Sequence, residues 1–171
     1  MKKNLHALFR ALTPEKMLQL NVEEHARVLT ELWRTRGGHV YVQGTTGTGK
    51  SAVAHNLATK LKADWFCYEL LSPEEFKAER DDIIARLVAS RKKVLILDGF
   101  FPQHAGRAFS ALLTELRDKG VSLFIFSQES LVPANPARRG ELSVDPGAFT
   151  TIAAFRYASQ ARHSVTLHQA E

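Results

Sequence analysis

The feature that most constrains this chain is an eight-residue segment, GTTGTGKS, at positions 44–51. Its three glycines allow a backbone path that side chains would obstruct, so successive N–H groups can point at one anion. An apolar run at 39–43 precedes the segment, and a helical pattern at 50–61 with Val53, Leu57 and Leu61 on one face follows it. Strand, glycine loop and helix in this order predict a phosphate-binding loop in an α/β domain.

Each fixed position of the loop has its own task. The backbone N–H groups bind phosphate oxygens, Lys50 brings its ammonium to the β- and γ-phosphates, and Ser51 offers a hydroxyl to Mg²⁺. The positive end of the following helix faces the same anion. We predict that ATP or GTP binds here with magnesium, and that the binding residues are Gly44, Thr45, Thr46, Gly47, Thr48, Gly49, Lys50 and Ser51. Without nucleotide, Lys50 is expected to face solvent.

A second element of the site is the apolar run VLILD at 94–98, which ends in the carboxylate of Asp98. In open α/β sheets, ligands bind at the carboxyl ends of the strands. Asp98 is therefore predicted to hold magnesium together with Ser51. The alternative is that Asp98 merely begins the turn formed with Gly99.

The rest of the chain predicts alternating strands and helices. Helices are expected to begin at 13–16 and 21–24, where Asn21 and Glu24 resemble a capping box, and Gly37 ends the second. Ser72, Pro73 and Glu75 form a helix start of the same kind. Further strands are predicted at 64–70, 93–98, 121–127, 150–157 and 163–168, and further helices at 72–90 and 104–119.

These patterns predict a three-layer α/β fold with a mainly parallel central sheet, because continuous apolar strands suit a sheet covered on both faces. We divide the chain into a helical N-terminal extension, residues 1–38, and a nucleotide-binding domain, residues 39–171. The last two strands are expected to close one edge of the sheet. The 20 residues at 128–147 form a long loop with three prolines and the pair Arg138 and Arg139.

Composition adds limits to this prediction. With 171 residues, of which 44% are hydrophobic, the chain can bury one core. One cysteine, Cys67, excludes an internal disulfide, and we expect it in the core. The absence of a long apolar run predicts no membrane span and a cytoplasmic location. The net charge of +5 arises mainly at the N-terminus and is compatible with a nucleic-acid partner or with simple solubility.

Hydrolysis needs a group that orients the attacking water, usually a carboxylate. The residue after Asp98 is Gly99 rather than glutamate. Glu69, at the end of the preceding predicted strand, and Glu129 are the candidates, and each is otherwise a solvent-facing carboxylate. Arg138 and Arg139 are candidates for a mobile lid over the nucleotide site of the same subunit. Alternatively, they form an arginine finger that completes the nucleotide site of a neighbouring subunit. An exposed basic loop is the third interpretation, and Arg156 is open to the same choice of roles.

The loop and the Asp98 strand together resemble the Walker A and Walker B motifs of P-loop NTPases. GTTGTGKS is similar to the loop of FtsK/HerA-type DNA translocases, and GVSLFIFSQ at 120–128 resembles a strand of that group and of type IV secretion coupling ATPases. This resemblance implies that Gln128 senses the γ-phosphate. The short spacing between Lys50 and Asp98 resembles DnaC/IstB-like helicase loaders. The resemblance implies a DNA-associated ATPase, acting in DNA translocation, transfer or helicase loading and activated by homo-oligomer or partner assembly.

A kinase is the alternative. LDGFFPQ at 97–103 resembles the LDGFPR segment of adenylate kinases, with an extra phenylalanine and with Gln103 in place of the arginine. The loop and its helix also suit a small-molecule or nucleotide kinase. A third possibility, suggested by the absent glutamate, is a nucleotide-dependent interaction module with weak hydrolysis.

Overall fold

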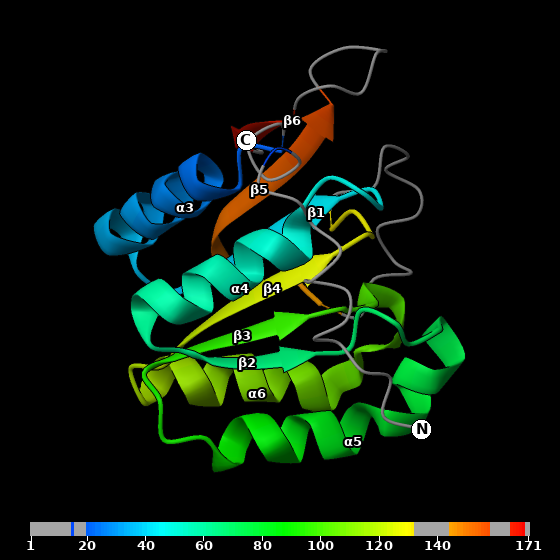
Figure 1. Ribbon diagram of the computed structural model, residues 1–171. Coiled ribbons are helices and arrows are strands. Elements are labelled where there is room, and N and C mark those ends of the chain that lie inside the picture. Colours follow the sequence, from blue (N-terminus) through cyan, green and yellow to red (C-terminus); the bar gives the residue numbers. More distant parts are fainter. Residues whose placement is uncertain (1–14, 16–19, 132–143, 158–164, 170–171) are drawn as a thin grey trace.

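A computed structural model describes residue 15 and residues 20–131, 144–157 and 165–169 of the chain. Its centre is a six-stranded sheet with the order β2-β3-β4-β1-β5-β6 (Figure 1). Five neighbouring strands are parallel, and β6 runs antiparallel to β5 at one edge. The strands are β1 (His39–Gly44), β2 (Asp64–Cys67), β3 (Val94–Asp98), β4 (Ser122–Ser127), β5 (Phe149–Tyr157) and β6 (Val165–Gln169).

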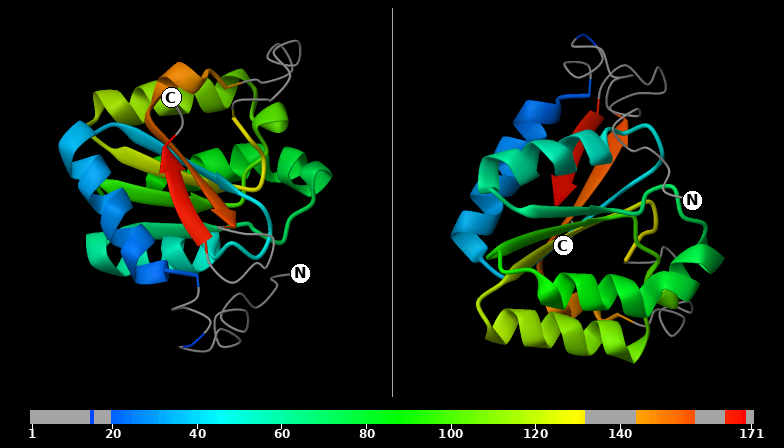
Figure 2. Two further views of the ribbon diagram at one scale, coloured as in Figure 1. Left: turned by 90° about the horizontal axis from the view of Figure 1, so that it is seen from above. Right: turned by 60° about the horizontal axis from the view of Figure 1, so that its bottom comes forward.

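Helices cover both faces of this sheet. The views of Figure 2 show α3 and α4 on one face and α5 and α6 on the other. Their bounds are α3 (Val22–Arg36), α4 (Lys50–Leu61), α5 (Pro73–Ala89) and α6 (Gly106–Asp118), with 3₁₀ turns η1 (Pro102–His104) and η3 (Pro146–Ala148). The predicted three-layer α/β fold with a mainly parallel sheet is confirmed.

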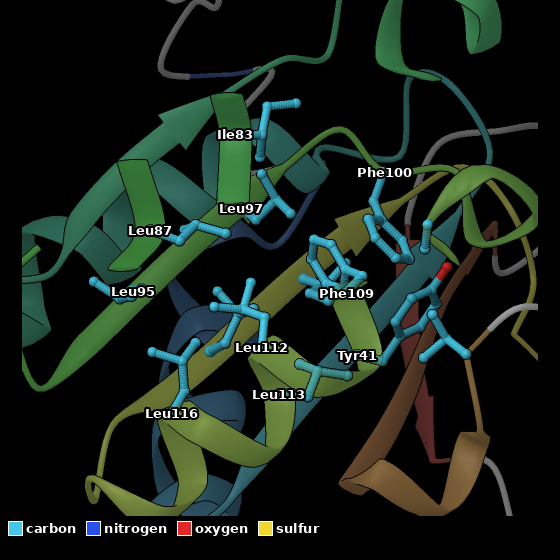
Figure 3. Packing of buried hydrophobic residues seen from close by; sticks show 14 of the residues in the cluster. Tyr41, Ile83, Leu87, Leu95, Leu97, Phe100, Phe109, Leu112, Leu113 and Leu116 are labelled. Atoms are coloured by element: carbon cyan, nitrogen blue, oxygen red, sulfur yellow. The ribbon is translucent and has the colours of Figure 1, made fainter. Parts of the chain in front are cut away.

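Successive side chains of each strand point to opposite faces and divide the core in two. Val40 and Val42 of β1 pack towards α3 and α4, whereas Tyr41 packs towards α5 and α6. Figure 3 shows the second cluster, in which leucines of β3 and α6 meet Phe100, Phe109 and Tyr41. Burial on both faces explains why these strands read as continuous apolar runs.

The strand order places the functional candidates at one edge of the sheet. All four strands β1 to β4 are parallel, so their carboxyl ends meet there. The predicted phosphate loop follows β1, Asp98 ends β3, and Gln128 follows β4, which lies between β1 and β3. The chain leaves β1 for α4 on one face and leaves β3 for α6 on the other, a divergence that marks the ligand-binding crevice of open α/β sheets.

Several predicted boundaries need correction. β2 ends at Cys67, so Glu69 lies in the following turn and not in the strand. α6 begins at Gly106 instead of His104, because η1 comes first and Gly106 has a φ of 74°. The capping box predicted at Asn21 is wrong: this residue has a φ of 53° and makes no side-chain capping hydrogen bond.

Other signals are confirmed. Ser72 and Glu75 form the predicted capping box of α5, with the Glu75 amide donating to Ser72 Oγ at 3.1 Å. Gly37 ends α3 with a φ of 63°. β5 and β6 close the sheet edge as predicted. The predicted helix start at 13–16 lies almost wholly outside the described residues.

The N-terminal extension contributes to the main core. Val22, Ala26 and Leu29 of α3 belong to the cluster formed by α4 and the sheet. Trp33 Nε1 donates to Ser122 Oγ at 2.8 Å, which ties α3 to β4. The division at residue 38 stays a prediction. No helix in the described part of the chain has the length and apolarity needed to cross a bilayer.

Candidate functional site

The loop after β1 owes its shape to glycine. Gly47 and Gly49 have φ values of 85° and 86°, a left-handed region that side chains rarely adopt. A Cβ at Gly44 would lie 2.9 Å from Thr48 Oγ1 and 3.0 Å from the Phe155 carbonyl oxygen of β5. Three positions of the motif are therefore glycine for backbone reasons that the structure makes explicit.

Hydrogen bonds to a single carbonyl hold the loop closed. The Thr45 oxygen accepts from Thr48 Oγ1 at 2.8 Å and from Lys50 Nζ at 3.0 Å. Thr45, Thr46 and Gly47 are exposed at the tip. Gly49 is the N-cap of α4 and offers no capping side chain, so the amides of the first turn are available to an anion.

Lys50 does not face solvent, which corrects the prediction. Its exposed fraction is 3%, and its ammonium lies under the loop against the Thr45 carbonyl. Burial lowers the pKa of Lys50, while the negative charges of Glu69 and Asp98 raise it. The Lys50 ammonium is thus already held at the base of the loop and does not have to move there from solvent.

Asp98 is fully buried, and one of its oxygens is unsatisfied. Oδ2 accepts from the Cys67 thiol at 3.5 Å, whereas Oδ1 has no hydrogen-bond partner among the described residues. Burial, followed by the charge of Glu69, raises the pKa of Asp98 to about 7; Ser51, Cys67 and Lys50 oppose that rise. A buried carboxylate oxygen without a partner is costly unless a cation or donor satisfies it.

These donors fit magnesium. Mg²⁺ prefers oxygen ligands and usually binds through one or two protein groups, with phosphates and waters completing the shell. Ser51 lowers the pKa of Asp98, so its hydroxyl lies near that carboxylate, and both side chains offer oxygen ligands. The described residues contain no group of three or more His, Cys, Asp or Glu side chains able to hold a metal by themselves. The oxygen pair therefore suits a nucleotide-bound cation better than a cation held by protein alone.

Glu69 and Gln128, which lie on different elements, meet at the same edge. Gln128 Nε2 donates to Glu69 Oε1 at 3.1 Å. The Glu69 charge raises the pKa of both Lys50 and Asp98, so it lies within electrostatic reach of each. Glu129, in contrast, acts on Tyr41: burial is the main cause that raises the pKa of Tyr41, and the charge of Glu129 adds to it. The Tyr41 hydroxyl donates to the Glu129 carbonyl at 2.9 Å.

Gly99 explains how Glu69 reaches this place. Gly99 has a φ of 99°, and a Cβ there would lie 2.5 Å from the Tyr68 carbonyl carbon and 2.6 Å from the Glu69 nitrogen. The Tyr68 amide donates to the Asp98 backbone carbonyl oxygen at 2.6 Å. The position after Asp98 is thus glycine because the chain that carries Glu69 crosses it.

The structure does not bring every predicted residue to the site. Arg138 and Arg139 lie outside the described residues. Arg156 is exposed on β5. Sequence reasoning missed Cys67 as a neighbour of Asp98, although the β2–β3 register pairs these two residues directly. Two parallel strands with polar ends were the available signal, but their pairing was not specified by the sequence.

Comparisons with known proteins identify the fold. No protein-family model matches the sequence, and no curated protein matches it. Among solved structures, the chain is similar to the ATPase DotB of Legionella pneumophila, with a TM-score of 0.52 and 12% sequence identity. The match covers 82% of this chain and 47% of DotB, so the chain corresponds to about half of that protein. The α/β fold of this chain, with five parallel strands in a sheet flanked by helices, therefore resembles the fold of that ATPase.

Proposed function

We propose that this chain binds ATP with Mg²⁺ at the phosphate loop and hydrolyses it. The observation that carries the proposal is the burial of two opposite charges beside the loop, Lys50 and Asp98, with Asp98 Oδ1 unsatisfied among the described residues. An unpaired buried carboxylate oxygen costs free energy that a bound cation would offset. The similarity to the ATPase DotB supports the fold on which this site is built.

The proposed roles follow from position. Loop amides and Lys50 bind the phosphates, and Ser51 and Asp98 hold the cation. When bound, Mg²⁺ neutralises charge that develops on the phosphate oxygens. Glu69 accepts a proton from the attacking water, and Gln128 holds Glu69 by the amide hydrogen bond at 3.1 Å. Glu69 is preferred to Glu129 because its charge acts on Lys50 and Asp98.

The kinase alternative gains less support. In the segment that resembles adenylate kinases, Phe100 is 1% exposed and packs against Tyr41, Phe76 and Phe109. Its carbonyl accepts from Ser127 Oγ at 2.6 Å. The residue after Asp98-Gly99 thus belongs to the core, and a phosphate acceptor would need to be bound by other residues.

We also propose that the ATPase is DNA-associated and activated by assembly with copies of itself or a partner. The support is the resemblance of the loop and of the strand ending in Gln128 to those of FtsK/HerA-type translocases. Arg138 and Arg139 are the proposed trans-acting residues. We propose ATP rather than GTP as the nucleotide, with the same resemblance as support.

Calorimetric titration of Mg-ATP tests the binding site. Lys50→Ala is expected to weaken affinity about 100-fold or more, because charge-assisted hydrogen bonds are each worth up to about 3 kcal/mol. Lys60→Ala, in the last turn of the same helix, is the matched control and should bind as wild type does. Unchanged affinity in a folded Lys50→Ala variant would refute the assignment.

Phosphate release separates the functional classes. The rate is measured with and without duplex DNA, beside phosphoryl transfer to nucleoside monophosphates. Stimulated release supports the DNA-associated ATPase. Transfer to a monophosphate supports the kinase, and tight binding with neither reaction supports an interaction module.

A further inference from the structure

The sheet edge opposite the phosphate loop gathers exposed cations. Each of β1, β2, β3 and β4 is preceded by a helix, and because these strands are parallel, the four helix-to-strand junctions lie at one edge. In Figure 1 they lie on the side where the arrows begin. The exposed cationic residues of these junctions are Arg34, Arg36, Lys60, Lys62, Arg91, Lys92, Lys93, Arg117 and Lys119, which we call the basic edge.

The basic edge is compact. Neighbouring strands lie about 4.8 Å apart, so the first residues of four adjacent strands span only about 15 Å. The register brings the β3 and β4 junctions together, since the Ser122 amide donates to the Lys93 carbonyl at 3.0 Å. α4 ends on one face of the sheet, whereas α5 and α6 end on the other. The cations therefore surround one end of the sheet.

Few carboxylates offset this charge. Lys119 pairs with Glu115 at 2.6 Å, and Arg117 lies 4.0 Å from Asp118. No ion pair within the described part of the chain involves the other lysines of the basic edge, Lys60, Lys62, Lys92 and Lys93.

Two further carboxylates lie at this edge. Asp64 accepts a hydrogen bond from the Ser90 hydroxyl, and Asp145 accepts one from the Gly147 amide at 2.9 Å, but both keep their negative charge. These two carboxylates, together with Glu115 and Asp118, leave an excess of positive charge against the nine cations of the basic edge.

Helix capping does not account for the whole arrangement. Cations in the last turn of a helix stabilise its dipole, which explains residues such as Lys60. Arg91, Lys92 and Lys93, however, follow the C-cap Ser90 and lie in the connection to β3. Three consecutive exposed cations outside a helix indicate a surface that attracts a polyanion.

We propose that the basic edge binds the phosphate backbone of double-stranded DNA, at a site separate from the nucleotide site. The proposal rests on the DNA-associated part of the proposed function. Duplex DNA carries one charge per about 1.7 Å of axis, so a cationic surface about 15 Å wide can contact several phosphates at once. Such contacts are independent of base sequence. DNA and ATP thus occupy opposite ends of the parallel strands.

Fluorescence anisotropy with a labelled duplex of mixed sequence tests the site at several salt concentrations. Lys92→Gln/Lys93→Gln should weaken binding about tenfold at low salt. It should also reduce the slope of log affinity against log salt by about 2, since each lost phosphate contact removes about 0.9. The control, Lys77→Gln/Arg107→Gln, removes the same amount of charge from two exposed residues near the N-terminal ends of α5 and α6, away from the basic edge. This control should bind DNA within about twofold of wild type.

The outcomes also separate this proposal from the nucleotide site. Mg-ATP affinity of Lys92→Gln/Lys93→Gln should equal that of wild type, and Lys50→Ala should retain DNA binding. If wild type does not bind ATP but Lys92→Gln/Lys93→Gln still loses DNA binding, the proposed ATPase is refuted and the DNA site at the basic edge is supported. Three outcomes would overturn the proposal. The two double variants could lose DNA affinity equally, or wild type could show no salt-dependent DNA binding. Wild type could also bind phosphatidylserine-containing vesicles more tightly than DNA.

Discussion

Burial shifts the pKa values of Lys50 and Asp98, which lie beside each other at the loop and the strand end, in opposite directions. Desolvation favours the neutral form of each, lowering the pKa of Lys50 and raising that of Asp98, and each charge partly opposes this effect on the other. Ser51 and Cys67 also stabilise the Asp98 carboxylate. In the absence of a bound phosphate or cation, burying these two charges therefore costs free energy. Such a cost is typical of a functional site rather than of a core optimised for stability.

Asp98→Asn is expected to stabilise the protein above neutral pH in metal-free buffer. The pKa of Asp98 is about 7 in the folded protein, against the ordinary value of 3.8 for this side chain, so the folded state binds more protons between these values. Stability must then fall as pH rises from about 4 to 7. The variant should melt several degrees higher than wild type at pH 8, and the difference should shrink at pH 5.

Exposed Asp118→Asn is the control for this measurement and should show no such pH dependence. The same Asp98→Asn protein should lose nucleotide affinity in Mg²⁺ more than in EDTA, because one charge beside the cation is gone. Equal losses in both buffers would make Asp98 a turn residue.

Gly99→Ala should lower turnover while leaving Mg-ATP affinity near that of wild type. An added Cβ would collide with the Tyr68–Glu69 backbone and displace the proposed base, whereas the phosphate loop lies on another strand. Gly120→Ala is the matched control: its φ of 71° carries similar backbone strain, but a Cβ there meets nothing within 4 Å. Similar turnover in the two variants, with kcat and KM measured separately, would contradict a positioning role for Gly99.

At the scale of elements, a capping pattern in the sequence predicts a helix start correctly where the contacts that form the start are themselves local. Ser72 and Glu75 satisfy each other's amides within one helical turn, so the sequence fixes the start of α5. Asn21 shares that pattern and yet adopts a left-handed conformation, because Leu20 and Val22 are both buried in the core and direct the chain there. Tertiary packing has overridden the local preference.

Ser72→Ala should lower the free energy of unfolding by about 1 kcal/mol, the usual value of an N-cap. Chemical denaturation followed by circular dichroism measures it. Ser72→Asp retains a capping oxygen and should remain close to wild type. A loss of equal size in Ser72→Asp would show that the capping bond in α5 contributes little to stability.

At the scale of the whole molecule, charge is segregated along the strand direction. Exposed cations gather where the strands begin, whereas Asp98, Glu69 and Glu129 lie where they end. The proposed ATP site and the proposed DNA site therefore lie at opposite ends of the same parallel strands. An assembly of copies would then present several basic edges to one duplex.

Arg138→Ala/Arg139→Ala tests whether the site is completed by a neighbour. In an assembled ATPase, the double variant should lose about 10³-fold or more of stimulated turnover while each protomer still binds ATP. Mixing it with Lys50→Ala should restore activity, since one subunit supplies the nucleotide site and the other supplies the arginines. A kinase with its own lid would show no rescue and no dependence on protein concentration.

The sequence alone determined the glycine loop between β1 and α4 and the alternation of strands and helices, because glycine spacing, apolar runs and capping residues act over a few neighbouring positions. It also suggested Asp98 and Glu69, whose roles stay predictions. Only the tertiary structure decided that β4 lies between β1 and β3, that Lys50 is buried, and that Gly99 lets the chain bearing Glu69 cross beside Asp98. Charges that nearly balance along the sequence between 39 and 130 separate in space, because parallel strands send every helix end to the same edge. Strand order and register depend on contacts between residues distant in the sequence, and no local pattern specifies them.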